Sequence, residues 1–226
     1  MLLQHFTLKR FLVGSLAIVL LTAVVLTYSG SHTTLPAPAT DISTSTAKGK
    51  QTVVLAGGCF WGMEAVFEHL KGVSDVVSGY SGGSAATAHY EAIGSGETGH
   101  AEAVRINYDP AQISYDQLLK VYFSVAHDPT QLNRQGPDSG TQYRSTIFFA
   151  NDGQKRVAQA YIEQLNKEQT FRKPIVTQLV PLNSFYAAEE YHQQFIARNP
   201  VHPYVVVHDL PKLNQLRKQF PDMYKN

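Results

Sequence analysis

The chain has 226 residues with 19 basic and 18 acidic side chains, which gives a net charge of +1. This length supports one sizeable core, and the even charge lacks the basic footprint of a nucleic-acid-binding domain. The single cysteine excludes an internal disulfide, so redox chemistry at this thiol must involve another molecule.

The N-terminus carries an uncharged apolar segment from Phe11 to Tyr28, preceded by Lys9 and Arg10. Its length reaches the lower limit for a helix that spans a bilayer. Residues 1–28 are therefore predicted to be a membrane anchor, and the preceding basic residues place the rest of the chain outside the cytoplasm, in the periplasm of a bacterium. The alternative is a signal segment cleaved near residue 31 or 39, which also exports the chain.

Residues 29–50 are rich in Ser, Thr, Ala and Pro and lack apolar periodicity. This composition is typical of a flexible tether. We expect the folded domain to occupy residues 51–226.

The domain opens with an apolar run at 53–56, which predicts a buried strand, and with helical spacing of apolar residues at 60–70. Gly57 and Gly58 form a turn between them and place Cys59 at the first turn of the helix. Unpaired N–H groups and the positive end of the helix dipole favour a thiolate there, which predicts a reactive cysteine. The alternative is a small buried apolar residue.

Apolar spacing in the rest of the chain predicts further strands and helices. Ser114 and Gln117 match a reciprocal capping box at a helix start. A polar segment at 127–142 is long for a loop, and such loops are usually functional or disordered. Helices between strands predict an α+β or α/β fold with helices packed on a mixed sheet. The predicted strands are 73–80, 100–108, 145–150 and 175–182, and the predicted helices are 115–126, 151–167 and 187–198.

Several short motifs follow one another between residues 51 and 200. They are Gly57-Gly58-Cys59-Phe60-Trp61-Gly62, Gly79-Tyr80-Ser81-Gly82-Gly83, Gly99-His100-Ala101-Glu102-Ala103-Val104, Tyr108-Asp109-Pro110, Asn133-Arg134-Gln135-Gly136-Pro137-Asp138, Gly140-Thr141-Gln142-Tyr143-Arg144-Ser145 and Glu190-Tyr191-His192-Gln193. In these motifs and their order, the chain resembles the A-type peptide methionine sulfoxide reductases.

The resemblance implies an α+β fold, a two-layer sandwich built on a ferredoxin-like core. It implies repair of oxidised proteins by reduction of methionine S-sulfoxide, in proteins and as the free amino acid. The implied site residues are Cys59 as nucleophile, Glu102 as the acid, Tyr90 and Tyr143 as hydroxyl donors to the sulfoxide oxygen, Phe60 and Trp61 as the pocket for the methyl group, and Asp138 as a polar neighbour.

These roles are chemically consistent. A sulfoxide oxygen is a poor leaving group, so thiolate attack on sulfur requires a proton at that oxygen. Glu102 must then be protonated near neutral pH, and desolvation by aromatic rings would raise its pKa accordingly. Attack leaves Cys59 as a sulfenic acid, the first reversible oxidation state of a thiol.

Many relatives carry further cysteines that attack the sulfenic acid, whereas this chain has none. Regeneration is therefore expected from an external thiol, a thioredoxin-like or glutaredoxin-like reductant. No prosthetic cofactor and no metal are expected, and the chain is expected to be a monomer.

Three other interpretations remain at this point. One of the nine histidines could serve Cys59 as a base in acyl transfer. Glu189 and His192 have the spacing of two metal ligands, but the second such pair that a site would need is missing from the sequence. The chain could also be a membrane-tethered module that binds methionine-bearing segments without chemistry.

Overall fold

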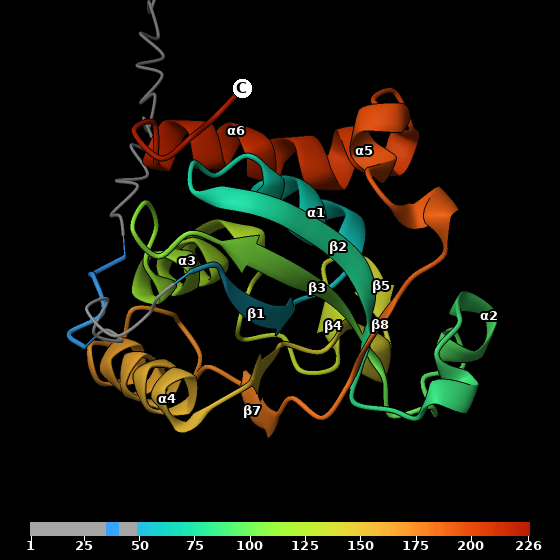
Figure 1. The fold of residues 1–226 in the computed structure, drawn as a ribbon, viewed down its shortest axis with the longest axis horizontal. Coiled ribbons are helices and arrows are strands. Elements are labelled where there is room, and N and C mark those ends of the chain that lie inside the picture. Colours follow the sequence, from blue (N-terminus) through green and yellow to red (C-terminus); the bar gives the residue numbers. More distant parts are fainter. Residues whose placement is uncertain (1–34, 41–48) are drawn as a thin grey trace, which may run out of the picture. The chain divides into compact units, whose positions relative to one another are not determined.

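The computed structural model describes residues 35–40 and 49–226 (Figure 1). The apolar segment predicted as an anchor lies outside these residues, as does most of the predicted tether. Within the described ranges, every helix falls short of the length and apolar character that a bilayer span requires.

Six strands form one sheet in the order β7-β6-β1-β3-β2-β8. Neighbours are antiparallel except β6 and β7, which are parallel. The strands are β1 (Gln51–Ala56), β2 (Val73–Ser81), β3 (Ala101–Tyr108), β6 (Thr146–Phe149), β7 (Gln178–Pro181) and β8 (Phe185–Ala187).

The four inner strands, β6-β1-β3-β2, have the connections of a ferredoxin-like fold. Helix α1 (Phe60–Glu68) joins β1 to β2, and helix α3 (Tyr115–Val121) follows β3 and precedes β6. The predicted α+β class with a ferredoxin-like core is confirmed.

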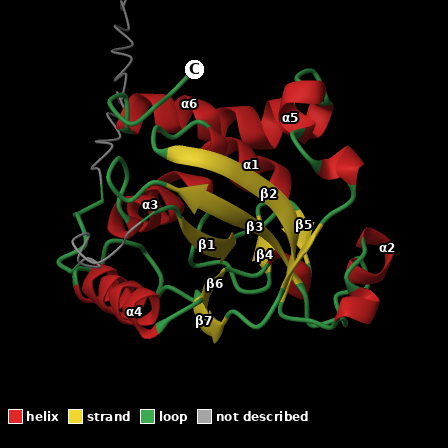
Figure 2. Cartoon of the chain, viewed as in Figure 1, coloured by secondary structure: helices red, strands yellow, loops and turns green. Residues whose placement is uncertain are grey.

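Four helices bury the main core against one face of the sheet. Helices α1 and α3 are joined there by α4 (Asp152–Lys167) and α6 (Leu210–Gln219), and α6 packs beside α1 (Figure 2). Val53 and Leu55 of β1 point into this core, whereas Val54 and Ala56 belong to a smaller apolar cluster on the other face. The alternation follows from the two-residue period of a strand.

The sheet curls so that its two edge strands approach each other. Strand β7 ends at Pro181 and β8 begins at Phe185, so only residues 182–184 connect the edges. A connection of this length spans at most about 14 Å, whereas the edges of a flat six-stranded sheet would lie about 24 Å apart. Phe185 and Leu182 pack on the smaller cluster, so this connection also covers the second face of the sheet.

The predicted helix at 115–126 begins as expected. Ser114 and Gln117 form the reciprocal capping box at its start. Helix α3 ends at Val121 and continues as the π-helical turn η3 (Tyr122–Ala126). The wider turn keeps Tyr122 directed into the sheet, where its hydroxyl donates to the carbonyl oxygen of Ala56 at 2.7 Å.

The predicted helix at 187–198 is wrong. The segment instead contains the last residue of β8, a 3-10 turn η5 (Glu190–His192) and the short helix α5 (Phe195–Arg198). The side chain of Gln193 accepts from Ser78 N and donates to Ser78 O, at 2.9 and 3.0 Å, and Gln194 is left-handed with φ of 51°. These contacts with β2 replace the backbone hydrogen bonds that a continuous helix would make.

The remaining elements lie in segments for which the sequence predicted no strand or helix. The 3-10 turn η2 (Ala85–Thr87) and helix α2 (Tyr90–Ile93) follow β2. A hairpin of β4 (Arg134–Gln135) and β5 (Asp138–Ser139) and the 3-10 turn η4 (Thr141–Tyr143) form the polar segment. The π-helical turn η6 (Val205–Asp209) leads into α6.

Residues 35–39, within the predicted tether, contact helix α4. Tyr161 donates its hydroxyl to Pro36 O at 2.8 Å, and the Gln164 side chain bonds to Ala37 O and Ala39 N at 3.1 and 3.0 Å. This part of the tether therefore lies against the folded domain.

Candidate active site

Cys59 lies between β1 and α1, as the sequence predicts. It is the N-cap residue of α1, with φ of −55° and ψ of 124°. Gly58 before it has φ of 93°, a left-handed conformation that favours glycine. A Cβ at Gly58 would also lie 2.5 Å from Cγ of Gln135 in β4, so the turn needs glycine for space as well. The hairpin is thereby packed next to the cysteine.

Burial opposes the effect of the helix start on the thiol. The thiol is buried, with 8% of the residue exposed. Burial raises the pKa of Cys59 well above that of an ordinary thiol, and the negative charges of Glu102 and Asp209 raise it further. The backbone N–H of Trp61 and the charge of Lys212 lower this pKa but do not outweigh burial. The helix start contributes as expected, yet desolvation dominates.

Glu102 lies beside the cysteine on strand β3. Its Oε2 accepts a hydrogen bond of 3.0 Å from the N–H of Phe60, the first residue of α1. Burial raises the pKa of Glu102 to about 8, the Phe60 N–H opposes the rise, and the charge of Asp138 adds to it. The carboxyl group is therefore mostly protonated at neutral pH, as its predicted role requires.

Tyr90 and Tyr143 reach the same place from two different segments. Tyr90 begins α2 and Tyr143 ends η4. Burial raises the pKa of both phenols, and the charges of Glu102 and Cys59 raise both further. Both phenols therefore remain protonated donors at neutral pH, and both interact electrostatically with the acid and the thiol.

Two sets of hydrogen bonds fix the segments that carry these tyrosines. Glu189 accepts from the Tyr80 hydroxyl at 2.8 Å and from the backbone N–H of Tyr90 at 2.9 Å, which fixes the start of α2 against β2. The guanidinium group of Arg144 donates to the carbonyl oxygens of residues 99, 100 and 141 at 2.8 to 3.0 Å. It thereby fixes η4 against the start of β3.

Asp138 also belongs to the cluster. It begins β5, and its carboxylate accepts a hydrogen bond from the hydroxyl of Tyr204. Its charge raises the pKa of Glu102 and of Tyr143. Tyr204 was not among the predicted site residues, although burial and the charge of Cys59 raise its pKa in turn.

Phe60 and Trp61 have different surroundings. Phe60 is buried in the main core, and its ring centroid lies 5.0 Å from that of His192. Trp61 is half-buried, stacks on Phe195 at 3.7 Å and meets the edge of Tyr204 at 5.9 Å. Its indole N–H donates to Nδ1 of His192 at 3.1 Å. Trp61 therefore lies beside the hydroxyl cluster, while Phe60 forms its buried wall.

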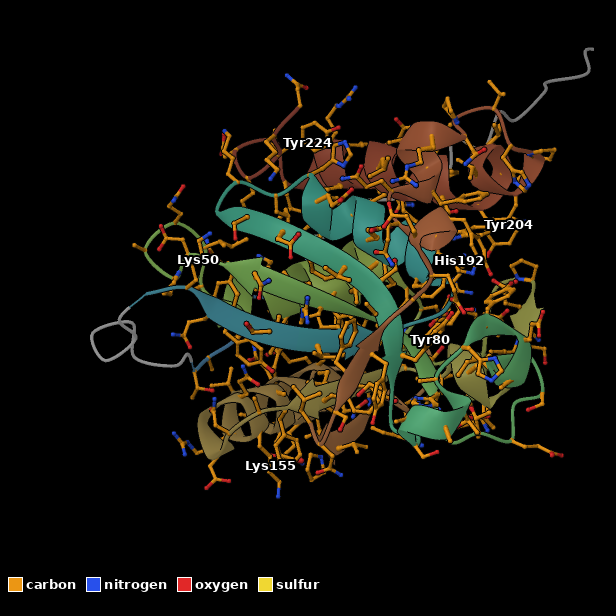
Figure 3. The ribbon with its side chains drawn as sticks, turned by 45° about the vertical axis from the view of Figure 1, so that its right-hand side comes forward. Lys50, Tyr80, Lys155, His192, Tyr204 and Tyr224 are labelled. Carbon is orange, nitrogen blue, oxygen red and sulfur yellow. The ribbon has the colours of Figure 1, made fainter. Side chains whose placement is uncertain are left out.

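Figure 3 shows Tyr80, His192 and Tyr204 toward one end of the domain, away from Lys50 at the entrance to β1. The arrangement surrounds one buried thiol with a protonated carboxyl group, phenol donors and aromatic rings. Such a site can deliver a proton to a neutral polar atom while the sulfur attacks its neighbour.

The histidines near this cluster are engaged elsewhere. His127 bonds to Ser145 Oγ at 2.7 Å and to Tyr122 O at 3.1 Å, and burial lowers its pKa to about 4. His192 accepts from Trp61, as described above. Neither arrangement is that of a base paired with the thiol.

Comparison with known families decides how this cluster is interpreted. The family described as peptide methionine sulfoxide reductase matches residues 51–224 of the chain. The chain belongs to the peptide methionine sulfoxide reductase family.

Individual relatives agree with this assignment. Peptide methionine sulfoxide reductase MsrA 2 of Synechocystis sp. is 56% identical over 193 residues, which cover 84% of this chain and 90% of that protein. The relative with the same description from Mesorhizobium japonicum is 58% identical over 178 residues, covering 79% of this chain and 91% of its own length.

Solved structures of the reductase family share the fold. Reduced Mxr1 from Saccharomyces cerevisiae superposes with a TM-score of 0.61 at 34% identity, covering 68% of this chain and 87% of that one. Methionine sulfoxide reductase A of Corynebacterium diphtheriae gives a TM-score of 0.58 at 34% identity, covering 74% and 84%.

Sequence reasoning missed Tyr204, Glu189 and the Asp209–Lys212 pair. Tyr204 and the pair lie beyond the last recognised motif, in a segment without strong periodicity. Glu189 directly precedes the motif at residues 190–193, but its spacing to His192 drew attention to metal binding rather than to the backbone of Tyr90. Contacts between distant segments leave little trace in a single sequence.

Glu102 provides a test of this electrostatic arrangement. Its raised pKa means that the neutral carboxyl group is favoured in the folded state, so its stabilising effect is complete below the ordinary carboxyl pKa and is lost as the pH rises to about 8. We expect the stability of Glu102→Gln relative to wild type to increase by a few kcal/mol from acidic pH to about pH 8, because only the wild-type carboxyl group ionises.

Urea unfolding of both proteins across this pH range measures the difference. Glu97→Gln, at an exposed loop position, is the matched control and should show no comparable drift. A stability difference for Glu102→Gln that does not change with pH would contradict the raised pKa.

Proposed function

We propose that the chain reduces the S epimer of methionine sulfoxide to methionine, in proteins and as the free amino acid, and thereby repairs oxidised proteins. The observation that carries this function is the buried Cys59 next to Glu102, whose carboxyl group is protonated at neutral pH. Membership of the peptide methionine sulfoxide reductase family supports the substrate.

In the first step the Cys59 sulfur attacks the sulfoxide sulfur while the sulfoxide oxygen receives a proton. Glu102 is the acid, and the hydroxyl groups of Tyr90 and Tyr143 donate hydrogen bonds to the oxygen as its negative charge develops. The overall change is a thiol plus a sulfoxide giving a sulfenic acid plus a thioether. The proton of the buried thiol balances the reaction, because it replaces the one that Glu102 donates.

The substrate methyl group would contact Trp61, beside Phe195 and Tyr204. Aromatic faces attract a sulfur-bound methyl group by dispersion and by sulfur–aromatic contact. Asp138 acts through the phenols, because it accepts from Tyr204 and its charge influences Tyr143.

In the second step an external thiol attacks the Cys59 sulfenic acid and releases water, which gives a mixed disulfide. A second thiol releases Cys59 as a thiol and leaves as the disulfide of the reductant. A dithiol protein of the thioredoxin-like or glutaredoxin-like type supplies both sulfur atoms. The single cysteine of the chain requires this intermolecular route.

Turnover with separated epimers tests the reaction. We expect dithiothreitol-dependent reduction of a peptide containing the S sulfoxide and none of the R sulfoxide. Cys59→Ser should abolish it, and Glu102→Gln should slow it by about 10²- to 10⁴-fold, the usual contribution of general acid catalysis.

Tyr90→Phe and Tyr143→Phe should each slow the reaction less than Glu102→Gln, because the remaining phenol still donates. Tyr224→Phe is the control, since its hydroxyl contacts Arg217 on α6 instead of the site. Absence of S-sulfoxide turnover by the folded wild-type protein would refute the function and favour a binding module.

The one-cysteine cycle has a separate test. After one equivalent of substrate and without reductant, intact mass should increase by one oxygen atom, and dimedone should trap the product at Cys59 as a sulfenic acid. Cys59→Ser is the control. An unchanged mass together with released methionine would contradict the sulfenic acid.

We also propose that the domain acts outside the cytoplasm, on the evidence of the apolar residues 11–28 and the basic residues before them. Fractionation of cells that express the full chain tests this location. We expect the protein in the membrane fraction, or in the exported fraction if the segment is cleaved. Recovery of the uncleaved chain from the soluble cytoplasm would refute the proposal.

A further inference from the structure

A buried ion pair lies beside helix α1, outside the cluster of acid and phenols. Lys212 Nζ of α6 lies 3.3 Å from Oδ1 of Asp209, the last residue of η6. The Asp209 side chain is fully buried and that of Lys212 is 19% exposed. Burial of two charges costs several kcal/mol per ion before their attraction offsets it, so a buried pair is weak evidence for a purely stabilising role.

The pair lies against the first turn of α1, close to the nucleophile. A Cβ added at Gly62 would lie 2.3 Å from Asp209 Oδ1 and 2.7 Å from Lys212 Nζ, so glycine is needed for this close approach. Gly62 is in the first turn of α1, three residues after the N-cap Cys59. The charged groups of η6 and α6 therefore lie against the first turn, beside the thiol.

The hydrogen bonding of the pair is incomplete. Asp209 Oδ2 is buried and has no hydrogen-bond partner, while Oδ1 is bound to Lys212. An ion pair selected for stability alone would satisfy both carboxylate oxygens.

Several charged or titratable groups face this region. Glu102 comes from β3, Asp138 from β5, His208 and Asp209 from η6, Lys212 from α6, and His127 follows η3; the phenols are Tyr90, Tyr143 and Tyr204. Burial raises the pKa of Cys59 most, and Glu102 and Asp209 add to this, whereas Lys212 lowers it. Among the described side chains with the largest effects on the thiol, Lys212 is the cation.

We propose that Lys212 is a positioning residue for the nucleophile, whose ammonium group Asp209 holds beside α1 so that it stabilises negative charge on the Cys59 sulfur. This inference rests on the proposed function for its purpose, because the thiol must lose its proton to attack the sulfoxide, and the sulfur leaves the mixed disulfide as a thiolate. Asp209 has two opposing effects, since it fixes the cation and also places its own negative charge near the sulfur.

The proposal predicts effects of opposite sign. Lys212→Met removes the cation and leaves Asp209, so the thiolate becomes less favourable. Asp209→Asn removes the negative charge, but its amide oxygen can still accept from the Lys212 ammonium group, so the thiolate becomes more favourable. The double variant loses both charges, and its thiol should resemble that of wild type. A pair that only stabilises the fold would give single variants that change in the same direction.

Alkylation of Cys59 by iodoacetamide provides the measurement, because only the thiolate reacts and the chain has no other cysteine. Rates are followed by intact mass from about pH 6 to about pH 10. At a fixed pH below the midpoint we expect Lys212→Met to react about threefold to tenfold more slowly and Asp209→Asn faster by a similar factor. Lys212→Arg should restore most of the wild-type rate.

Lys218→Met on the exposed side of α6 is the matched control and should leave the profile unchanged. Thermal unfolding verifies that each variant is folded before its profile is compared. Single variants that shift the profile in the same direction, or leave it unchanged while folded, overturn the proposal.

This experiment is independent of turnover. Alkylation requires neither methionine sulfoxide nor a reductant, so the effect of Lys212 can be found even if the chain does not reduce sulfoxides. Where reduction does occur, kcat/KM for the S sulfoxide should fall in Lys212→Met and recover in Lys212→Arg.

Discussion

The site depends on one hydrogen bond, between the N–H of Phe60 and the carboxyl group of Glu102. It connects the first residue of α1 to β3, a central strand of the sheet, so that the acid and the nucleophile are held by elements that cannot move independently. It also occupies an N–H group at the start of the helix that would otherwise be unpaired. The segments bearing Tyr90 and Tyr143 are then held around this centre by the hydrogen bonds of Glu189 and Arg144.

Burial raises the pKa of both Glu102 and Cys59, and the consequence differs between the two groups. The carboxyl group becomes a proton donor at neutral pH because its charged form is disfavoured. Burial also raises the pKa of the thiol, which keeps the sulfur protonated at neutral pH. Thiols in this state react slowly with oxidants and metals, since the thiolate is the reactive form. For a chain whose only cysteine is its nucleophile, this protects the one group that no other residue could replace.

Local patterns predicted much of the fold. The strand and helix around Cys59 and the capping box at Ser114 were found because their apolar spacing and caps are properties of neighbouring residues. The helix predicted at 187–198 was wrong because Gln193 and Glu189 bond to β2 and α2, which are distant in the sequence. The motifs identified most of the cluster. Tyr204 joins the cluster, and the Asp209–Lys212 pair lies beside it, only through tertiary packing. The charge state of Cys59 could not be predicted, because it depends on how deeply the fold buries the sulfur.

Residues 35–39 bind along α4 through Tyr161 and Gln164. In Figure 1 this segment lies beside α4, across the view from α2 and α5, the helices that begin at Tyr90 and Phe195. Residues 35–39 therefore lie away from the aromatic side chains around Cys59. Because residues 35–39 lie on the side of the domain that carries α4, they leave steric room beside Cys59 for bulky partners, such as a folded client or a reductant protein.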